Sequence, residues 1–154
     1  MTKILFVCAG NICRSPMAEF FMKRFATDAG CLDQFHIESA AVTDDEVGNR
    51  VYAPVYTRIW KRGADCSKKT ARQLTREDYD RFDYLIGMDS SNIEGMKEIC
   101  GGDPEGKMSM LLDWTEAPRE IADPWYTRDF DTAEIQIEAG CKALLKKLKK
   151  AQPE

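Results

Sequence analysis

Histidine is almost missing from this sequence, which contains a single one, His36, among 154 residues. A metal site built from several histidines is therefore excluded, and a Ser/His/Asp triad could be assembled only around this residue. His36 lies in the stretch Phe-His-Ile-Glu-Ser-Ala (35–40), whose pattern predicts the start of a strand. We therefore expect His36 to occupy a structural position at the edge of that strand.

The sequence also lacks the paired cysteines that hold zinc. None of its six cysteines forms a Cys-x2-Cys pair, and Cys8 with Cys13 has no second ligand pair at the usual spacing, so we expect no metal site. The cysteines are spread irregularly, at Cys8, Cys13, Cys31, Cys66, Cys100 and Cys141. The N-terminal Met-Thr-Lys enters an apolar run without a secretory signal pattern, which favours a cytoplasmic protein with reduced thiols.

Excess positive charge and long apolar runs are missing as well. With 22 Lys and Arg against 26 Asp and Glu, the net charge is −4. General binding to nucleic acid or to an anionic membrane needs a basic surface, so any recognition of phosphate must be local. No apolar stretch approaches the roughly 20 residues that span a bilayer. We expect neither a nucleic-acid partner nor a membrane span.

The length and the 44% of hydrophobic residues suit one compact domain over residues 1–154. Apolar and amphipathic segments alternate along the chain, which predicts a doubly wound α/β sandwich with a short parallel sheet. The expected strands are 4–7, 36–41, 82–88 and 108–112. The expected helices are 16–30, 54–63, 75–81, 89–100 and 131–150.

The most informative stretch covers residues 3–16. Its apolar run 4–7 is typical of a strand buried on both faces, and the run stops at Cys8. A polar segment with one glycine follows, here called the Cys8 loop (residues 8–14), and then a helical pattern. A strand-to-helix turn of this kind presents backbone N–H groups and a helix N-terminus, so it can bind an anion.

The helix after this loop has its own start signals. Ser15 is a natural N-terminal cap, Pro16 suits the first helical position, and Glu19 supplies a carboxylate for the first turn. Gly30 marks its end.

The side chains of the Cys8 loop suit a tetrahedral oxyanion. Arg14 closes a Cys-x5-Arg pattern, and its guanidinium can clamp two oxygens. Positive dipoles and the Arg14 charge favour the thiolate, which makes Cys8 a nucleophile. Gly10 and Asn11 tolerate the left-handed backbone that turns N–H groups inward. The alternative, a cysteine that merely ends a buried strand, leaves this combination unexplained.

Expulsion of an alkoxide or phenolate needs an acid, and Asp123 is the candidate. It lies in Ile-Ala-Asp-Pro-Trp-Tyr (121–126), where proline stiffens the loop and the two rings can exclude water. Asp129 and Asp131 are expected to cap the last helix instead. Asp89 fits two hypotheses, contact with the site or capping of the helix that it precedes.

Residues 7–16, Val-Cys-Ala-Gly-Asn-Ile-Cys-Arg-Ser-Pro, resemble the signature of the low-molecular-weight protein tyrosine phosphatases. Other stretches similar to that family are 39–42, 71–73, 82–84, 88–92 and 123–126. The resemblance implies a flavodoxin-like, three-layer α/β sandwich with a short four-stranded parallel sheet. It also implies hydrolysis of phosphotyrosine in proteins or peptides, without metal or cofactor and with phosphate as product or inhibitor.

The mechanism that the resemblance implies begins with a phosphocysteine on Cys8. Arg14 and the loop amides hold the equatorial oxygens, and Asp123 protonates the leaving group and later activates water. Ser15 stabilises the sulfur as it leaves.

The resemblance also implies supporting and substrate-binding residues. Ser39 bonds to Asn11 and holds the loop open, while Lys69 stands where many relatives place a histidine of the same network. The expected substrate-binding residues are Ala9, Gly10, Asn11, Ile12, Cys13, Ser15, Trp125 and Tyr126.

This chain departs from the usual pattern in the exposed stretch 43–53, where Glu46 stands in place of an aromatic contact residue. Tyr52 is a possible substitute. Tyr52, Tyr56 and Trp60 recur at four-residue spacing, and we expect that stripe to belong to the core rather than to a ligand platform.

Three other functions stay open. In an arsenate reductase two further cysteines would relay a disulfide, but the remaining cysteines are far apart in sequence. A phosphocysteine carrier would need no leaving-group acid. Phosphoarginine phosphatases look similar but carry Thr where this chain has Ile12, which favours phosphotyrosine. Cys13 lies five residues from Cys8 and could capture its oxidised form, which predicts redox control.

Overall fold

The computed structural model describes residues 1–150, which build a four-stranded parallel sheet in the order β2-β1-β3-β4. The strands are β1 (Thr2–Cys8), β2 (Phe35–Ala41), β3 (Tyr84–Gly87) and β4 (Met108–Met110). Strand β1 therefore lies inside the sheet, between β2 and β3. The loop that follows β1 leaves the middle of the sheet at the carboxyl ends of the strands.

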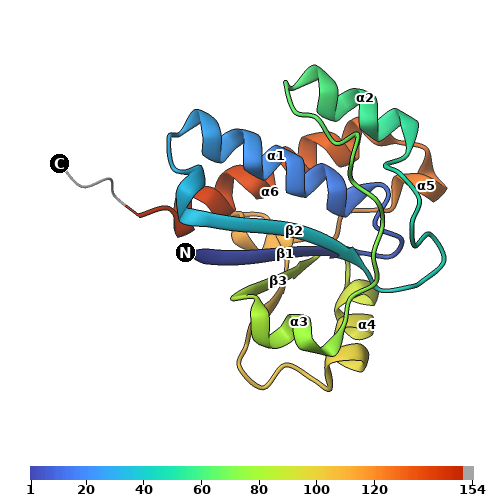
Figure 1. Cartoon of the computed structure of the whole chain (residues 1–154), viewed down its shortest axis with the longest axis vertical. Coiled ribbons are helices and arrows are strands. Elements are labelled where there is room, and N and C mark those ends of the chain that lie inside the picture. Colours follow the sequence, from blue (N-terminus) through green and yellow to red (C-terminus); the bar gives the residue numbers. More distant parts are fainter. Residues whose placement is uncertain (151–154) are drawn as a thin grey trace.

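Helices cover both faces of the sheet, so the molecule has three layers (Figure 1). One side carries α1 (Arg14–Asp28), α2 (Ala53–Lys61), α5 (Pro124–Thr127) and α6 (Phe130–Leu148). The other side carries α3 (Arg76–Arg81) and α4 (Ser90–Cys100). Short 3-10 turns lie at Leu32–Gln34 and Leu111–Trp114. The flavodoxin-like α/β sandwich expected from the sequence is confirmed.

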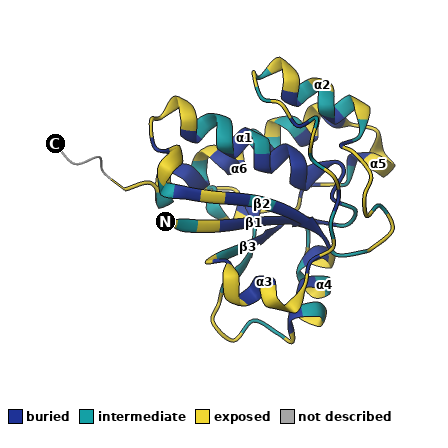
Figure 2. Ribbon diagram, viewed as in Figure 1, coloured by how far each residue is buried: buried dark blue, intermediate teal, exposed yellow. Residues whose placement is uncertain are grey.

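The core lies on both sides of β1, as its uninterrupted apolar run predicts. Ile4 and Phe6 pack into the cluster under α1 and α6, whereas Leu5 and Val7 pack into the cluster under α3 and α4. All four side chains are 0% exposed. Figure 2 shows the buried residues concentrated along the sheet and on the helix faces that cover it. Burial on both faces fixes the position of the Cys8 backbone.

Hydrogen bonds beyond the strands gather three loops at the carboxyl edge of the sheet. The backbone N–H of Val42 donates to the Cys8 carbonyl at 2.9 Å, and that of Thr43 donates to the Ala9 carbonyl at 3.0 Å. The N–H of Ile121 donates to the carbonyl of Met88, just after β3, at 2.9 Å. Segments far apart in sequence therefore meet around the Cys8 loop.

The start of α1 differs from the sequence prediction. The helix begins at Arg14, and Ser15 makes no capping bond because its hydroxyl points to the Cys8 loop instead. Pro16 falls within the first turn, and Glu19 lies beyond it. The cap prediction was wrong because the oxygen of Ser15 is used by tertiary partners.

The expectation that Trp60 belongs to the core is also wrong. Trp60 is 61% exposed, whereas Val55 and Ile59 of the same helix are 0% exposed and take its inner face. Tyr52 and Tyr56 pack partly against the core. A helix has 3.6 residues per turn, so residues four apart turn gradually around its axis. Trp60, the third residue of the stripe, therefore lies off the buried face.

Predicted element ends differ by a few residues. The strand expected over 108–112 ends at Met110, and the last helix begins at Phe130 and ends at Leu148. Asp129 caps that helix by accepting from the Thr132 N–H at 3.0 Å, whereas Asp131 pairs with Arg58.

His36 lies exposed on β2 and bonds to Glu38, in the edge position that was expected. Within residues 1–150, no helix has both the length and the apolar character that crossing a bilayer requires.

Candidate active site

Polar groups surround the sulfur of Cys8 where β1 ends. The backbone N–H of Asn11 donates to Cys8 Sγ over 3.3 Å, and Ser15 Oγ lies 3.0 Å from the same sulfur. Cys8 itself is 3% exposed. Hydrogen bonds of this kind stabilise negative charge on an acceptor. The sulfur is therefore prepared for a step in which it carries charge.

Asn11 holds the Cys8 loop in shape. Its backbone is left-handed, with φ at 60°, a conformation that asparagine tolerates better than most residues. Its Nδ2 donates to Ser15 Oγ at 2.8 Å and to Ser39 Oγ at 3.0 Å, while its Oδ1 accepts from the Arg72 N–H at 3.2 Å. The contact between Ser39 and Asn11 that the resemblance implies is present.

A buried carboxylate supports this arrangement from behind. Ser39 Oγ donates to Glu19 Oε1 at 2.6 Å, and Glu19 is only 5% exposed. Lys23 Nζ lies 2.7 Å from the other carboxylate oxygen, and Lys69 Nζ lies 3.9 Å from the first. Sequence reasoning missed Glu19 in this role. The signal was its spacing of four residues from Ser15, which places both on one face of α1.

Lys69 acts on this network through Ser39. Its Nζ donates to the Ser39 carbonyl at 2.9 Å, and burial lowers the pKa of the ammonium group despite the nearby Glu19 charge. Lys69 thus lies beneath the Ser39 backbone, with its charge close to Glu19.

The Arg14 guanidinium is buried and only partly paired. Its NH1 donates to Asp89 Oδ2 and to the Ile121 carbonyl, both at 2.7 Å, and its NH2 lies 3.5 Å from Asp123 Oδ2. Its Nε has no hydrogen-bond partner among the described residues. Buried donors are nearly always paired, so this Nε is available to an oxyanion bound beside the loop.

Asp89 has both roles that the sequence left open. One of its oxygens bonds to Arg14, and the other accepts from the Asn92 N–H at 2.8 Å and caps α4. Burial opposes ionisation of Asp89, but the bonds from Arg14, Ser91 and Asn92 outweigh it and hold the pKa of the carboxyl below its ordinary value. Asp89 is therefore a stable counter-charge for Arg14.

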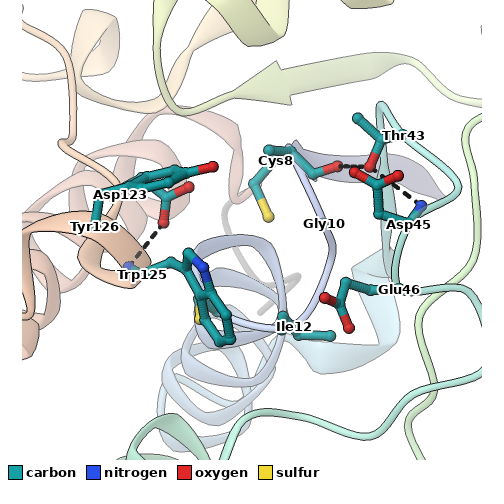
Figure 3. Close-up of a pocket in the computed structure, with 11 residues that line it drawn as sticks. Cys8, Gly10, Ile12, Thr43, Asp45, Glu46, Asp123, Trp125 and Tyr126 are labelled. Atoms are coloured by element: carbon teal, nitrogen blue, oxygen red, sulfur yellow. Dashed lines mark hydrogen bonds between the residues drawn. The ribbon is translucent and has the colours of Figure 1, made fainter.

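A cavity of about 240 Å³ opens above these groups (Figure 3). Figure 3 shows Cys8 facing this cavity, with Asp123 and Trp125 on one side and Glu46 on the other. Its lining consists of Cys8, Ala9, Gly10, Ile12, Cys13, Thr43, Asp45, Glu46, Asp123, Trp125 and Tyr126. Asn11, Arg14 and Ser15, expected from the sequence to contact a ligand, lie behind this lining. Thr43 and Asp45 were missed by sequence reasoning because no motif marks their loop.

Asp123 is held at the start of α5. Its Oδ1 accepts from the Trp125 N–H at 3.0 Å, and its side chain is 21% exposed. Trp125 and Tyr126 are 42% and 81% exposed, so each ring keeps free surface at the cavity mouth. The carboxyl group, the sulfur and the two rings therefore share one opening.

Glu46 lines the cavity and gives it an acidic wall. Glu46 Oε2 accepts from Asn49 Nδ2 at 2.6 Å, and the Glu46 Cγ would lie 3.3 Å from a Cβ built on Gly10. Tyr52 does not substitute for the missing aromatic wall, because it lies outside the lining. Its ring packs edge-on behind Trp125, with the centroids 4.9 Å apart.

Cys13 also lines the cavity, and it differs chemically from an exposed thiol. Burial, together with the nearby charges of Cys8 and Asp123, raises the pKa of Cys13 to about 12. The six cysteines are all free. Across residues 1–150, no three His, Cys, Asp or Glu side chains are grouped so that they could hold a metal ion.

Comparison with known proteins gives a consistent family. Residues 3–154 match the family model described as low molecular weight phosphotyrosine protein phosphatase. The chain is 34% identical over 152 residues to the low molecular weight protein-tyrosine-phosphatase YfkJ of Bacillus subtilis, with 97% of each chain covered. It is 38% identical over 156 residues to the low molecular weight phosphotyrosine protein phosphatase of Rattus norvegicus, with 94% of each covered.

Solved structures agree with the sequence comparison. The crystal structure of YfkJ superposes with a TM-score of 0.92 at 33% identity, over 96% of this chain and 94% of that one. The structure of DARP, described as a Drosophila arginine phosphatase, superposes with a TM-score of 0.87 at 26% identity, over 98% and 100%. The match over nearly the whole chain shows that this protein belongs to the low molecular weight phosphotyrosine protein phosphatase family.

Proposed function

We propose that the protein hydrolyses phosphotyrosine in proteins and peptides through a phosphocysteine on Cys8, without a metal ion. The observation that carries this proposal is the convergence of three groups on one cavity. Cys8 and Asp123 line this cavity, and the Asp123 carboxyl lies 3.5 Å from the buried Arg14 guanidinium, whose Nε has no partner among the described residues.

In the first step Cys8 Sγ attacks phosphorus as the bond to the leaving oxygen breaks. Asp123 gives its proton to that oxygen, so a neutral phenol departs. The guanidinium of Arg14 and the N–H groups of the Cys8 loop bind the three equatorial oxygens, whose charge needs fixed donors rather than mobile water. These donors supply the stabilisation that magnesium gives in other phosphoryl-transfer enzymes.

In the second step Asp123, now ionised, accepts a proton from water as the water oxygen attacks phosphorus. The bond between phosphorus and sulfur breaks, and the electron pair returns to Cys8 Sγ. The Ser15 hydroxyl, 3.0 Å from that sulfur, donates to it and stabilises the departing thiolate. Inorganic phosphate is released, and the same contacts make it a product inhibitor.

The shape of the cavity favours an aryl phosphate. Trp125 and Tyr126 offer ring surface at its mouth, while Ile12 adds apolar bulk inside it. A phosphotyrosine ring can pack between these walls with its phosphate at the sulfur, whereas phosphoserine is too short to fill them.

Phosphoarginine is the second candidate, favoured by the structural similarity to DARP. Against it, Ile12 cannot aim a water as a hydroxyl could. Cys66, Cys100 and Cys141 are buried, which disfavours an arsenate-reducing relay, and Asp123 at the cavity disfavours a stable phosphocysteine carrier.

Two further properties belong to the proposal. Cys13 shares the cavity with Cys8, so an oxidised Cys8 can be captured there as a reversible disulfide. The raised pKa of Cys13 slows this capture, because the thiolate is the attacking form. Six free cysteines suit a reducing compartment, which supports a cytoplasmic location.

Replacing Cys8 by Ser should abolish turnover of p-nitrophenyl phosphate in EDTA, because a hydroxyl is a far weaker nucleophile than a thiolate. Arg14→Lys should raise the barrier by about 3 kcal/mol, since a point charge cannot fork two oxygens. Arg24→Lys is the control. Arg24 forms an exposed ion pair with Asp28 on α1, so this variant should keep wild-type rates. Wild-type hydrolysis by Cys8→Ser, or loss of wild-type activity in EDTA, would contradict the proposal.

Asp123→Asn should slow hydrolysis strongly when the leaving group is a basic phenol and much less when it is an acidic one, because only a poor leaving group needs the proton. The measurement is kcat/KM across a series of aryl phosphates. Asp129→Asn, which alters a helix cap, is the control. If only that variant showed the leaving-group dependence, the acid would be Asp129.

On matched peptides that differ only in the phosphoresidue, kcat/KM for phosphotyrosine should exceed that for phosphoserine and phosphothreonine by about a hundredfold or more. The margin over phosphoarginine should be smaller. Glu46→Gln should weaken a preference for basic residues beside phosphotyrosine, while Glu94→Gln on α4 should not. Faster turnover of the phosphoarginine peptide would overturn the tyrosine assignment and leave the chemistry of Cys8 intact.

Peroxide should oxidise Cys8 to a sulfenic acid, and the Cys13 thiol should then displace water to form a disulfide that dithiothreitol reduces. The Cys13→Ser variant should recover a smaller fraction of its activity than the wild type after the same exposure. Cys66→Ser is the control and should recover like the wild type. Equal recovery by Cys13→Ser would remove the protective role of Cys13.

A further inference from the structure

Arg128 has a backbone conformation that an arginine rarely adopts. Its φ is 60° and its ψ is 11°, the left-handed region, at the C-terminal end of the four-residue helix α5. A side chain with a Cβ is disfavoured there, and such residues persist only where the surroundings hold them. Within residues 1–150, the other non-glycine residue with positive φ is Asn11, in the Cys8 loop.

The contacts of the Arg128 side chain account for its position. Its NH2 donates to the Tyr52 hydroxyl at 2.8 Å. Its guanidinium carbon lies 5.4 Å from the ring centroid of Tyr52, 6.0 Å from that of Trp125 and 5.2 Å from that of Phe130. Planar guanidinium groups stack on aromatic faces in this way. One cation thus joins the ring of Tyr52 to two rings that lie close to Arg128 in sequence.

Tyr52 connects this cluster to the nucleophile. Its backbone N–H donates to the carbonyl of Ile12, inside the Cys8 loop, at 3.0 Å. Its ring packs edge-on against Trp125, two residues after Asp123. Tyr52 is therefore joined to the Cys8 loop by its backbone and to the loop of Asp123 by its side chain.

Arg14 holds the segment just before α5 through Ile121 and Asp123, but the helix itself buries little of its surface. Pro124 is its one buried residue, and Trp125 and Tyr126 expose much of their surface. The N–H of Arg128 donates to the Pro124 carbonyl at 2.9 Å and closes the helix on itself. A four-residue helix without a buried face depends on its side contacts, and those of Arg128 and Tyr52 tie it to the nucleophile loop.

We propose that Arg128 and Tyr52 are positioning residues, a clamp that fixes the distance between the Asp123 carboxyl and the Cys8 sulfur. This inference rests on the proposed function, because it assumes that Asp123 is the leaving-group acid. Neither residue lines the cavity, so we assign them to the support of α5 rather than to contact with the phosphate group. Their effect passes through the placement of α5, and small displacements of a catalytic group are costly.

The test uses the full-length protein and the variants Arg128→Gly, Tyr52→Phe and the double variant. Glycine suits the left-handed backbone, so Arg128→Gly removes the guanidinium without adding backbone strain. Tyr52→Phe keeps the ring against Trp125 and deletes only the hydroxyl, which makes it the conservative variant if the glycine variant does not fold. Lys147→Gln is the matched control, because Lys147 near the end of α6 also lies over a ring, that of Trp114, and donates to the Trp114 carbonyl.

The measurements are kcat/KM across a series of aryl phosphates and the melting temperature. We expect Arg128→Gly to lower kcat/KM about tenfold for basic phenols and to change it little for acidic ones. Tyr52→Phe should lower kcat/KM for basic phenols by a smaller factor. The double variant should lose no more kcat/KM than Arg128→Gly does. The loss of melting temperature should not follow the loss of kcat/KM. Lys147→Gln should melt at a lower temperature than the wild type and yet keep the wild-type kcat/KM for every leaving group.

Several outcomes would overturn the clamp. One is that Tyr52→Phe and Arg128→Gly keep the wild-type dependence of kcat/KM on the leaving group. Another is that kcat/KM falls equally for all leaving groups. The third is that the losses of kcat/KM in the two single variants add fully in the double variant. Asp123→Asn, measured in parallel, separates a failure of the proposed acid from a failure of the clamp. If it leaves the series unchanged, the proposed acid fails. If Asp123→Asn makes kcat/KM depend more steeply on leaving-group basicity while Arg128→Gly does not, the clamp alone fails.

Discussion

Burial of the Arg14 guanidinium is the constraint on which the rest of the site depends. A buried charge is tolerated only when it is paired and hydrogen-bonded. Asp89 comes from the end of β3 and the Ile121 carbonyl from the loop before α5, and both bond to the same nitrogen. Pairing this one cation therefore draws together the Cys8 loop, the cap of α4 and the segment that carries Asp123. The remaining Nε faces no partner in the described chain, which leaves part of the charge for a ligand.

The hydrogen bonds behind the loop have a fixed direction, and Glu19 sets it. A carboxylate only accepts, so the Ser39 hydroxyl must donate to it and can then accept from Asn11. Asn11 donates to Ser15 as well, which leaves the Ser15 proton for the sulfur of Cys8 at 3.0 Å or for the Ala40 carbonyl at 3.4 Å. A buried anion at one end of the chain of bonds thus fixes Ser39 as an acceptor from Asn11.

Local patterns in the sequence were enough to predict the sheet, the Cys8 loop and the loop of Asp123. Burial on both faces, a turn before a helix and a proline after a carboxylate are properties of neighbouring residues. The errors on the site concern residues whose best partner lies outside their own helix. Ser15 has the side chain of a helix cap but bonds to Cys8 and Asn11, and Glu19 finds its partner on β2. No local pattern indicates that Arg128 meets Tyr52, because their contact depends on how α5 packs.

The two walls of the cavity have unlike chemistry, and this matters for the design of selective inhibitors. Trp125 forms one wall, while the other is the carboxylate of Glu46, held against Gly10 by Asn49. An aryl phosphonate with an ammonium group on the far side of its ring would gain an ion pair here. Its ring would pack on Trp125 at the same time, so one small compound would use both walls of the cavity.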